Sequence, residues 1–196
     1  METTTLSFEN MHEHGPLFAN MLRARHDLFI RQNGWQLPEA MGMEFDQYDT
    51  PASRWVVVHD ADGTVLAGNR LTPTTARCGI YSYMIRDAQR GLLETIPSDL
   101  LYEEAPVSAE VWESSRLFVS QAVPAAQRQR VYAQLVVEIA KAAHAMGATY
   151  GLTLLSATWP RWSRRVGVQM EAMGPVMTIE GVKNQVVAMR IAGPAH

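Results

Sequence analysis

The chain has 196 residues, of which 47% are hydrophobic and 19% are charged, with a formal net charge of -3 and a pI near 6.1. This length suits one compact domain with a core. The slight acidic excess argues against a nucleic-acid-binding protein, because such proteins usually carry a basic excess. The one cysteine, Cys78, excludes an internal disulfide and a cysteine-based metal cluster.

The N-terminal segment lacks the basic flank and apolar run of a signal peptide, and no stretch approaches about 18 apolar residues. We therefore expect a cytoplasmic protein without a membrane span. No repeat, low-complexity tract or linker divides the sequence, which predicts a single domain over residues 1–196.

The first elements in chain order are a strand, a helix and a hairpin. A strand is expected at residues 3–8, and a helix of about four turns is expected from Pro16 to Gly34 because apolar residues recur there at helical spacing. Residues 36–50 have no period and predict an irregular loop. The β-rich runs 55–58 and 64–66 flank a turn that ends in Gly63, a pattern typical of a hairpin.

The second half alternates between strands and helices. We expect strands at residues 111–119, 150–155, 176–179 and 185–191, a helix over 125–146, and a short helix that begins near Pro160. This order predicts an α/β fold with a mixed, twisted sheet flanked by helices and a βαβ crossover between Val111 and Leu155. Neither a G-x-G-x-x-G nor a P-loop motif is present, so a doubly wound nucleotide-binding fold is not expected.

Charged and aromatic residues are concentrated between Arg25 and Arg116. Arg25 and Phe29 are four residues apart, so they share one helix face. A buried arginine needs an acid, and Asp46 or Asp49 can supply one as a bidentate pair. Taken singly, each of these residues is more often structural or solvated than functional.

The joint spacing is more informative than any single residue. The pattern R-x3-F-x5-W-x10-D-x2-D from Arg25 to Asp49, then Arg70, then E-x-S-R from Glu113 to Arg116, resembles the acyl-homoserine-lactone synthases, the autoinducer synthase family of bacterial quorum sensing. The resemblance is strong over the first two thirds of the chain and extends through the R-R-x-G segment at residues 164–167. It implies a fold like that of the GNAT acyltransferases. The sequence departs from the family pattern at Gln89, where the family usually has Phe. The identity of the acyl group is therefore left open.

In that family S-adenosylmethionine is a substrate, and no separate cofactor or metal is implied. Its amine attacks an acyl thioester on an acyl carrier protein, and its carboxylate then displaces methylthioadenosine to close the lactone. The resemblance implies that Arg25 and Arg70 hold this carboxylate or organise the acids, while Asp46 and Asp49 face the cationic half of the donor. Phe29 and Trp35 would stack on its adenine or sulfonium side.

The same resemblance assigns the chemical steps to the strand at residues 111–119. Glu113 is expected to be the general base, directly or through a water, because the attacking amine must lose a proton. Arg116 is expected to pair with an acid and fix the N-terminal loop, with Ser115 supporting that network. From the GNAT fold we expect backbone N–H groups near Leu117 and Phe118, at a strand irregularity, to stabilise the thioester oxygen.

Two further sets of residues concern the acyl substrate. By position, Thr153, Leu155 and Trp159 resemble the acyl pocket of the family, with ordinary core as the alternative; a bulky Trp159 there would favour a short, branched or aromatic acyl group. The segment from Gln121 to Arg165 carries one acid and six basic residues, which would suit an acidic carrier protein unless they form only a solvated face. These six are Arg128, Arg130, Lys141, Arg161, Arg164 and Arg165.

Two other functions compete with this interpretation. A GNAT-type N-acyltransferase would use acetyl-CoA on another amine, but residues 125–131 lack the glycines with which that group binds the CoA pyrophosphate. A non-catalytic sensor would have kept the donor pocket without turnover, and the intact set of acids and arginines argues against it. The choice between acyl carrier protein and acyl-CoA, and the oligomeric state, stay open.

Overall fold

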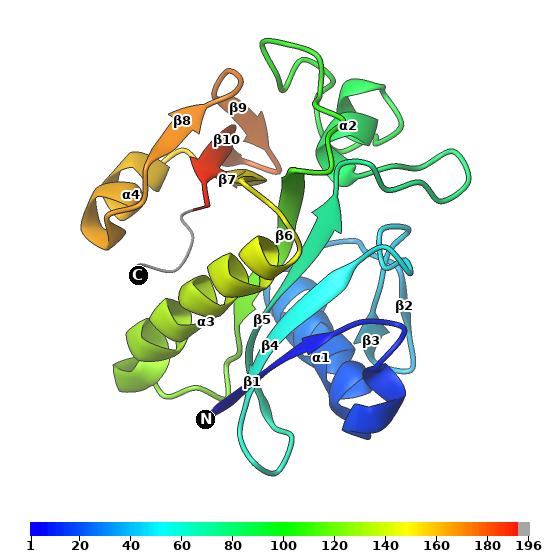
Figure 1. The fold of residues 1–196 in the computed structure, drawn as a ribbon, viewed down its shortest axis with the longest axis vertical. Coiled ribbons are helices and arrows are strands. Elements are labelled where there is room, and N and C mark those ends of the chain that lie inside the picture. The colour runs from blue at the N-terminus through cyan, green and yellow to red at the C-terminus, as the bar shows by residue number, and fades with distance from the viewer. Residues whose placement is uncertain (192–196) are drawn as a thin grey trace. The chain divides into compact units, whose positions relative to one another are not determined.

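A computed structural model describes residues 1–191, with the side chains of Arg165 and Val166 left out (Figure 1). Residue contacts divide the chain into two compact units, which we call unit 1 (residues 1–71 and 116–142) and unit 2 (residues 72–115 and 143–191). Three elements, β5 (Val65–Pro73), β6 (Val111–Val119) and α3 (Ala125–Ala145), contribute residues to both units. Within residues 1–191 no helix is both long and apolar enough to cross a membrane.

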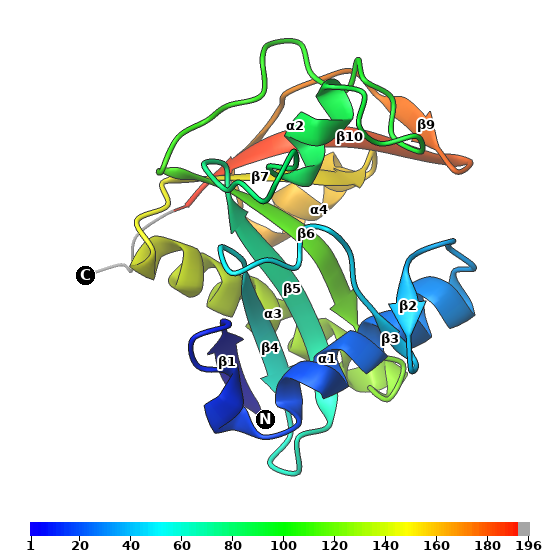
Figure 2. The same cartoon turned by 90° about the vertical axis from the view of Figure 1, so that its right-hand side faces the viewer.

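Unit 1 is built on three antiparallel strands in the order β1 (Glu2–Leu6), β4 (Arg54–His59), β5. On β4, Trp55 and Val57 pack in one apolar cluster with residues of α1 (Leu17–His26), while the alternate residues Val56 and Val58 are buried on the other face. Figures 1 and 2 show α1 and α3 on these two opposite faces. The predicted first strand and the first hairpin are therefore confirmed.

The helix predicted from Pro16 to Gly34 is confirmed at its start but changes type. A 3-10 turn (Met11–His14) precedes α1, and after His26 the chain continues as a π-helical turn, Asp27–Gln32. The N–H of Asn33 donates to the carbonyl oxygen of Leu28 at 3.0 Å, five residues back. The turn ends at Gly34, whose φ of 72° suits a glycine. π-helical turns are often found at functional sites.

The expectation of an irregular loop over residues 36–50 is wrong in part. Two short strands, β2 (Glu39–Ala40) and β3 (Met43–Glu44), form a hairpin there. Its two turn residues, Met41 and Gly42, have φ values of 52° and 72°. Two positive φ values are the geometry that matches the twist of a two-residue hairpin, but Met41 gives no sequence signal for it.

Unit 2 contains the mixed part of the sheet. The strand order is β6, β7 (Tyr150–Ser156), β10 (Val182–Arg190), β8 (Met170–Ala172), and β9 (Met177–Ile179) pairs with β10. β6 and β7 run parallel, with Val111 opposite Tyr150 and Ser114 opposite Thr153, whereas the other pairs are antiparallel. Because α3 joins these parallel strands, the predicted crossover and the predicted mixed sheet are both confirmed.

Two short helices complete unit 2. Ile85 and Ala88 of α2 (Met84–Gln89) pack with Leu152 of β7 and Val186 of β10 in one apolar core. The predicted short helix is α4 (Trp159–Val166), which begins with Pro160 in its first turn. The sequence pattern predicted neither α2 nor β8, because six and three residues are too few to show a period.

Candidate functional site

Arg25 is fully buried on the inner face of α1 and is held by two acids. Its Nη1 and Nη2 donate to the two carboxylate oxygens of Asp49 at 2.8 and 3.0 Å, and its Nε donates to Glu44 at 2.5 Å. Asp49 also accepts from the indole N–H of Trp55 at 3.0 Å. The buried arginine therefore has the bidentate partner that the sequence predicted, and Asp49 rather than Asp46 supplies it.

Two more arginines complete the network. Arg70 of β5 donates to both oxygens of Asp46 at 2.5 and 3.2 Å and lies 3.0 Å from Asp49. Arg116 of β6 lies 2.9 Å from Asp46 and 3.2 Å from Glu44. The pairing of Arg116 with acids of the N-terminal loop is thus confirmed. We call the six residues Arg25, Glu44, Asp46, Asp49, Arg70 and Arg116 the ion cluster.

The ion cluster balances three guanidinium groups against three carboxylates. Burial opposes the charged form of Asp49, but Arg70 and Arg25 more than offset it, so the pKa of Asp49 lies well below its ordinary value. Burial likewise opposes the charged form of Asp46, while Arg70 and Arg116 lower its pKa. Burial also penalises the Arg25 charge, yet Asp49 raises the pKa of Arg25. Asp46, Asp49 and Arg25 are therefore ionised at neutral pH.

This network predicts acid sensitivity of the fold. A carboxylate with a folded pKa below its unfolded value of about 3.9 stabilises the protein above that value and loses the contribution as pH falls toward the folded pKa. We expect the free energy of unfolding, measured by urea denaturation, to be steady between about pH 5 and 7 and to fall below about pH 4. A stability that stayed level down to pH 3 would contradict the role given to Asp46 and Asp49.

An aromatic pair adjoins the ion cluster. The rings of Phe29 and Trp35 are stacked, with centroids 5.2 Å apart and planes 10° from parallel. The guanidinium carbon of Arg116 lies 5.6 Å from the centroid of Phe29. The π-helical turn carries Phe29, and the glycine end of that turn leads to Trp35. Both predicted aromatic residues are brought together, and their role toward a ligand stays a prediction.

Arg116 also marks an irregularity in β6. Its φ is 52°, a left-handed conformation that is uncommon for an arginine in a strand and costs free energy. The strand irregularity expected near Leu117 and Phe118 is therefore present, one residue earlier. Its use as an oxyanion site stays a prediction.

Glu113, the predicted base, is completely buried in unit 2. Its Oε1 accepts the backbone N–H of Ile85 at 2.8 Å, and its Oε2 accepts that of Met84 at 3.2 Å. These are the first N–H groups of α2, so Glu113 caps that helix. Burial and the Glu113 charge raise the pKa of Tyr83, which precedes α2. Ser115 is buried on the same strand as Glu113.

The three candidate acyl-pocket residues share one face of unit 2. Thr153 and Leu155 alternate with Leu152 and Leu154, which belong to the apolar core under α2. The indole N–H of Trp159 donates at 2.8 Å to Gln185, which lies opposite Leu155 in the register. All three therefore lie on the face away from α2, and whether an acyl chain binds there stays a prediction.

The candidate docking residues do not all share a surface. Arg128, Arg130 and Lys141 are exposed on α3, but only Arg130 and Lys141, eleven residues apart, fall on one helix face. Arg128 points to another side of α3, and the docking role of these residues stays a prediction. Lys141 also pairs with Glu138 at 2.8 Å. Arg161 and Arg164 are exposed on α4, and the Arg165 side chain lies outside the described residues.

Gln89, the residue that departs from the family pattern, makes two hydrogen bonds to the backbone of the loop at residues 103–105. Its side-chain nitrogen donates to the carbonyl oxygen of Glu103, and its side-chain oxygen accepts the N–H of Ala105, both at 2.8 Å. The hydroxyl of Tyr83 donates to Pro106 at 2.7 Å in the same stretch. A phenylalanine at position 89 would make neither of these two backbone contacts.

Glu44 is the member of the ion cluster that sequence reasoning missed. Its side chain is completely buried on β3, and its carboxylate contacts both Arg25 and Arg116. Two features of the sequence could have predicted it. Glu44 lies two residues before Asp46, and three arginines need a third acid beside Asp46 and Asp49.

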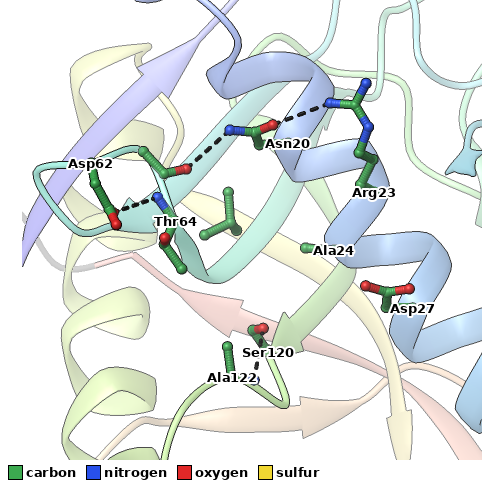
Figure 3. A pocket seen from close by; sticks show the side chains of 10 residues that line it. Asn20, Arg23, Ala24, Asp27, Asp62, Thr64, Ser120 and Ala122 are labelled. Carbon is green, nitrogen blue, oxygen red and sulfur yellow. Dashed lines mark hydrogen bonds between the residues drawn. The ribbon is translucent and has the colours of Figure 1, made fainter.

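Unit 1 also has a cavity of about 300 Å³, lined by α1, the β4–β5 turn and the segment after β6. Figure 3 shows Asn20, Asp62 and Ser120 around its rim, and no member of the ion cluster lines it. Among the side chains that the structure describes, no group of three His, Cys, Asp or Glu residues is placed to hold a metal ion.

Comparison with known proteins decides the family. Residues 9–193 match the model of the autoinducer synthase family. The chain belongs to this family. The acyl-homoserine-lactone synthase of Ralstonia nicotianae (strain ATCC BAA-1114 / GMI1000) is 33% identical over 168 residues, which cover 83% of this chain and 76% of that protein.

Solved structures agree with the autoinducer synthase fold. The crystal structure of TofI in a ternary complex with an inhibitor and MTA has a TM-score of 0.76 and 27% identity, and covers 97% of this chain and 92% of that chain. BjaI, a CoA-dependent acyl-homoserine lactone synthase solved with SAM and isopentyl-CoA, has a TM-score of 0.78 at 20% identity, which shows the fold alone; the match covers 96% of this chain and 82% of that chain. The predicted GNAT-like α/β fold is confirmed, and the chain is an acyltransferase of the acyl-homoserine-lactone synthase family.

Proposed function

We propose that this autoinducer synthase joins S-adenosylmethionine to an acyl group held as a thioester on an acyl carrier protein or on CoA. The α-amine attacks the thioester carbonyl, the C–S bond breaks and a thiol leaves. The carboxylate of the donor then attacks its own γ-carbon, the bond to the sulfonium breaks, and methylthioadenosine leaves as the lactone closes. The observation that carries the proposal is the buried ion cluster with its aromatic pair, in a chain that matches the family over residues 9–193.

The accessible edge of the ion cluster supports a donor site. Arg25, Arg70 and Glu44 are at most 1% exposed, whereas the side chains of Asp46 and Asp49 retain 6% and 7% and Arg116 retains 12%. Arg25 and Arg70 therefore organise the acids, and Asp46 and Asp49 are the carboxylates that reach toward the cationic half of the donor. The Phe29 and Trp35 pair supplies the aromatic surface for adenine or the sulfonium.

Glu113 takes the proton of the attacking amine, directly or through a water. The N–H groups of Met84 and Ile85 donate to the two oxygens of this carboxylate and so fix its orientation. Backbone N–H groups that follow the irregularity at Arg116 stabilise the thioester oxygen, and Ser115 supports this strand. Thr153, Leu155 and Trp159 line the acyl pocket. The single exposed thiol of Cys78 suits a reducing cytoplasm.

Product analysis tests the proposal. The purified protein would be incubated with S-adenosylmethionine and a panel of acyl thioesters, and the products separated by mass spectrometry. Methylthioadenosine together with a lactone is the expected result. Thiol release that depends on an added second amine and yields no methylthioadenosine would identify an N-acyltransferase instead. Binding of S-adenosylmethionine without either product would identify a sensor.

Charge reversal tests docking of an acidic acyl carrier protein. Arg128→Glu and Arg164→Glu should raise the KM for the carrier-linked substrate on the order of tenfold and spare a small thioester analogue, because only the carrier is steered by surface charge. Arg31→Glu is the matched control, since Arg31 is 71% exposed but lies outside the basic segment. Equal effects of Arg128→Glu on both substrates would remove the docking assignment.

A further inference from the structure

Glu44 enters the ion cluster from a hairpin whose two strands differ sharply in exposure. Its register partner across the hairpin is Glu39, whose side chain is 49% exposed and pairs with His26. Glu44 itself is 0% exposed. The hairpin therefore buries the carboxylate of Glu44 and leaves that of Glu39 in contact with water. A buried carboxylate is tolerated only where donors compensate it.

The donors to Glu44 come from two different elements. Its Oε2 accepts from Nε of Arg25 on α1 at 2.5 Å, and its Oε1 accepts from Nε of Arg116 on β6 at 3.2 Å. Of the three acids in the ion cluster, Asp49 contacts Arg25 and Arg70, and Asp46 contacts Arg70 and Arg116. Glu44 is therefore the acid that joins Arg25 to Arg116.

The connection continues from Arg116 into the aromatic pair. The guanidinium of Arg116 lies over Phe29, and Phe29 is stacked on Trp35. Arg116 holds this place from a backbone with a φ of 52°, which costs free energy that its side-chain contacts must offset. Removal of the Glu44 charge leaves Arg116 with Asp46 as its remaining ion-pair partner within the cluster.

We infer that Glu44 is a positioning residue of the donor site: it fixes the Arg116 guanidinium against Phe29 and so sets the aromatic surface on which the adenosyl part of S-adenosylmethionine binds. This inference rests on the proposed function for the identity of the ligand. Glu44 acts through Arg116 and Phe29, since its own side chain is completely buried.

Steady-state kinetics of Glu44→Gln, Glu44→Asp and Glu39→Gln test the inference. Glu44→Gln should raise the KM for S-adenosylmethionine about tenfold or more while kcat changes less than about threefold, because the groups that react are retained. Glu44→Asp keeps the charge but is one methylene shorter, so it should also raise this KM even where its melting temperature equals that of the wild type. Glu39→Gln should leave both constants unchanged. A KM for Glu44→Asp and Glu44→Gln equal to that for Glu39→Gln would overturn the inference.

A second measurement needs no substrate. In protein labelled with ¹⁵N-arginine, the Nε–H of Arg116 should exchange slowly with solvent in the wild type and in Glu39→Gln, and faster in Glu44→Asp. Unchanged exchange in Glu44→Asp would refute the positioning role. If the wild type released no methylthioadenosine, the proposed function would fail, and the exchange data would still decide whether Glu44 holds Arg116.

Discussion

Glu113→Gln is expected to slow methylthioadenosine release by a factor of about 10² to 10⁴ and to leave the affinity for S-adenosylmethionine nearly unchanged. The substitution removes the proton acceptor but keeps the size of the side chain and one carbonyl oxygen. The rate of release in a single turnover, together with the Kd from calorimetry, separates the two quantities. An unaltered rate would remove Glu113 as the base.

The structure supplies a control for this experiment. Glu113 also caps α2, so replacing its carboxylate with an amide weakens the hydrogen bond from the N–H of Met84 or Ile85. Loss of a helix cap costs about 1 kcal/mol. Asp87 is another buried carboxylate at the start of the same helix, where it accepts from the N–H of Ser82 at 2.8 Å and from its hydroxyl at 2.7 Å. Asp87→Asn should disturb α2 without removing a base. A loss of rate as large in Asp87→Asn as in Glu113→Gln would assign the effect to the helix instead.

Asp49→Asn is expected to lower the free energy of unfolding by about 3–5 kcal/mol, because it leaves three buried guanidinium groups with two carboxylates. Asp49 accepts from Arg25 and from the indole N–H of Trp55, and it lies 3.0 Å from Arg70. For a chain of this length the loss corresponds to a melting temperature lower by roughly 6–20 °C. Urea and thermal unfolding monitored by circular dichroism measure it.

Asp62→Asn is the matched control for Asp49→Asn. Asp62 lies in the exposed β4–β5 turn, where it accepts the N–H of Thr64 at 3.0 Å. The same chemical change there removes a charge that is already solvated, so no measurable shift in the unfolding midpoint is expected. If Asp49→Asn were as mild as Asp62→Asn, the ion cluster would not be a main source of stability in unit 1.

Local patterns in the sequence predicted the long elements well. β6 is found at the predicted residues, and α3 differs from its prediction by one residue, because strands and helices of this length show their period clearly. The elements that were missed, among them α2, β8 and the β2–β3 hairpin, are too short for a period. Their geometry depends on partners elsewhere in the chain: α2 is capped by Glu113, which lies 28 residues after Ile85.

The sequence by itself determined the family and most of the residues of the candidate site, because the order and spacing of Arg25, Asp49 and Arg116 are properties of the chain alone. Only the tertiary structure decided which acid pairs with which arginine. Glu44 lies 19 residues from Arg25 and 72 from Arg116, and pairings over such separations are set by how hairpin, helix and strand pack. For the same reason the small net charge of -3 gave no sign of a buried cluster of six charged side chains that cancel one another.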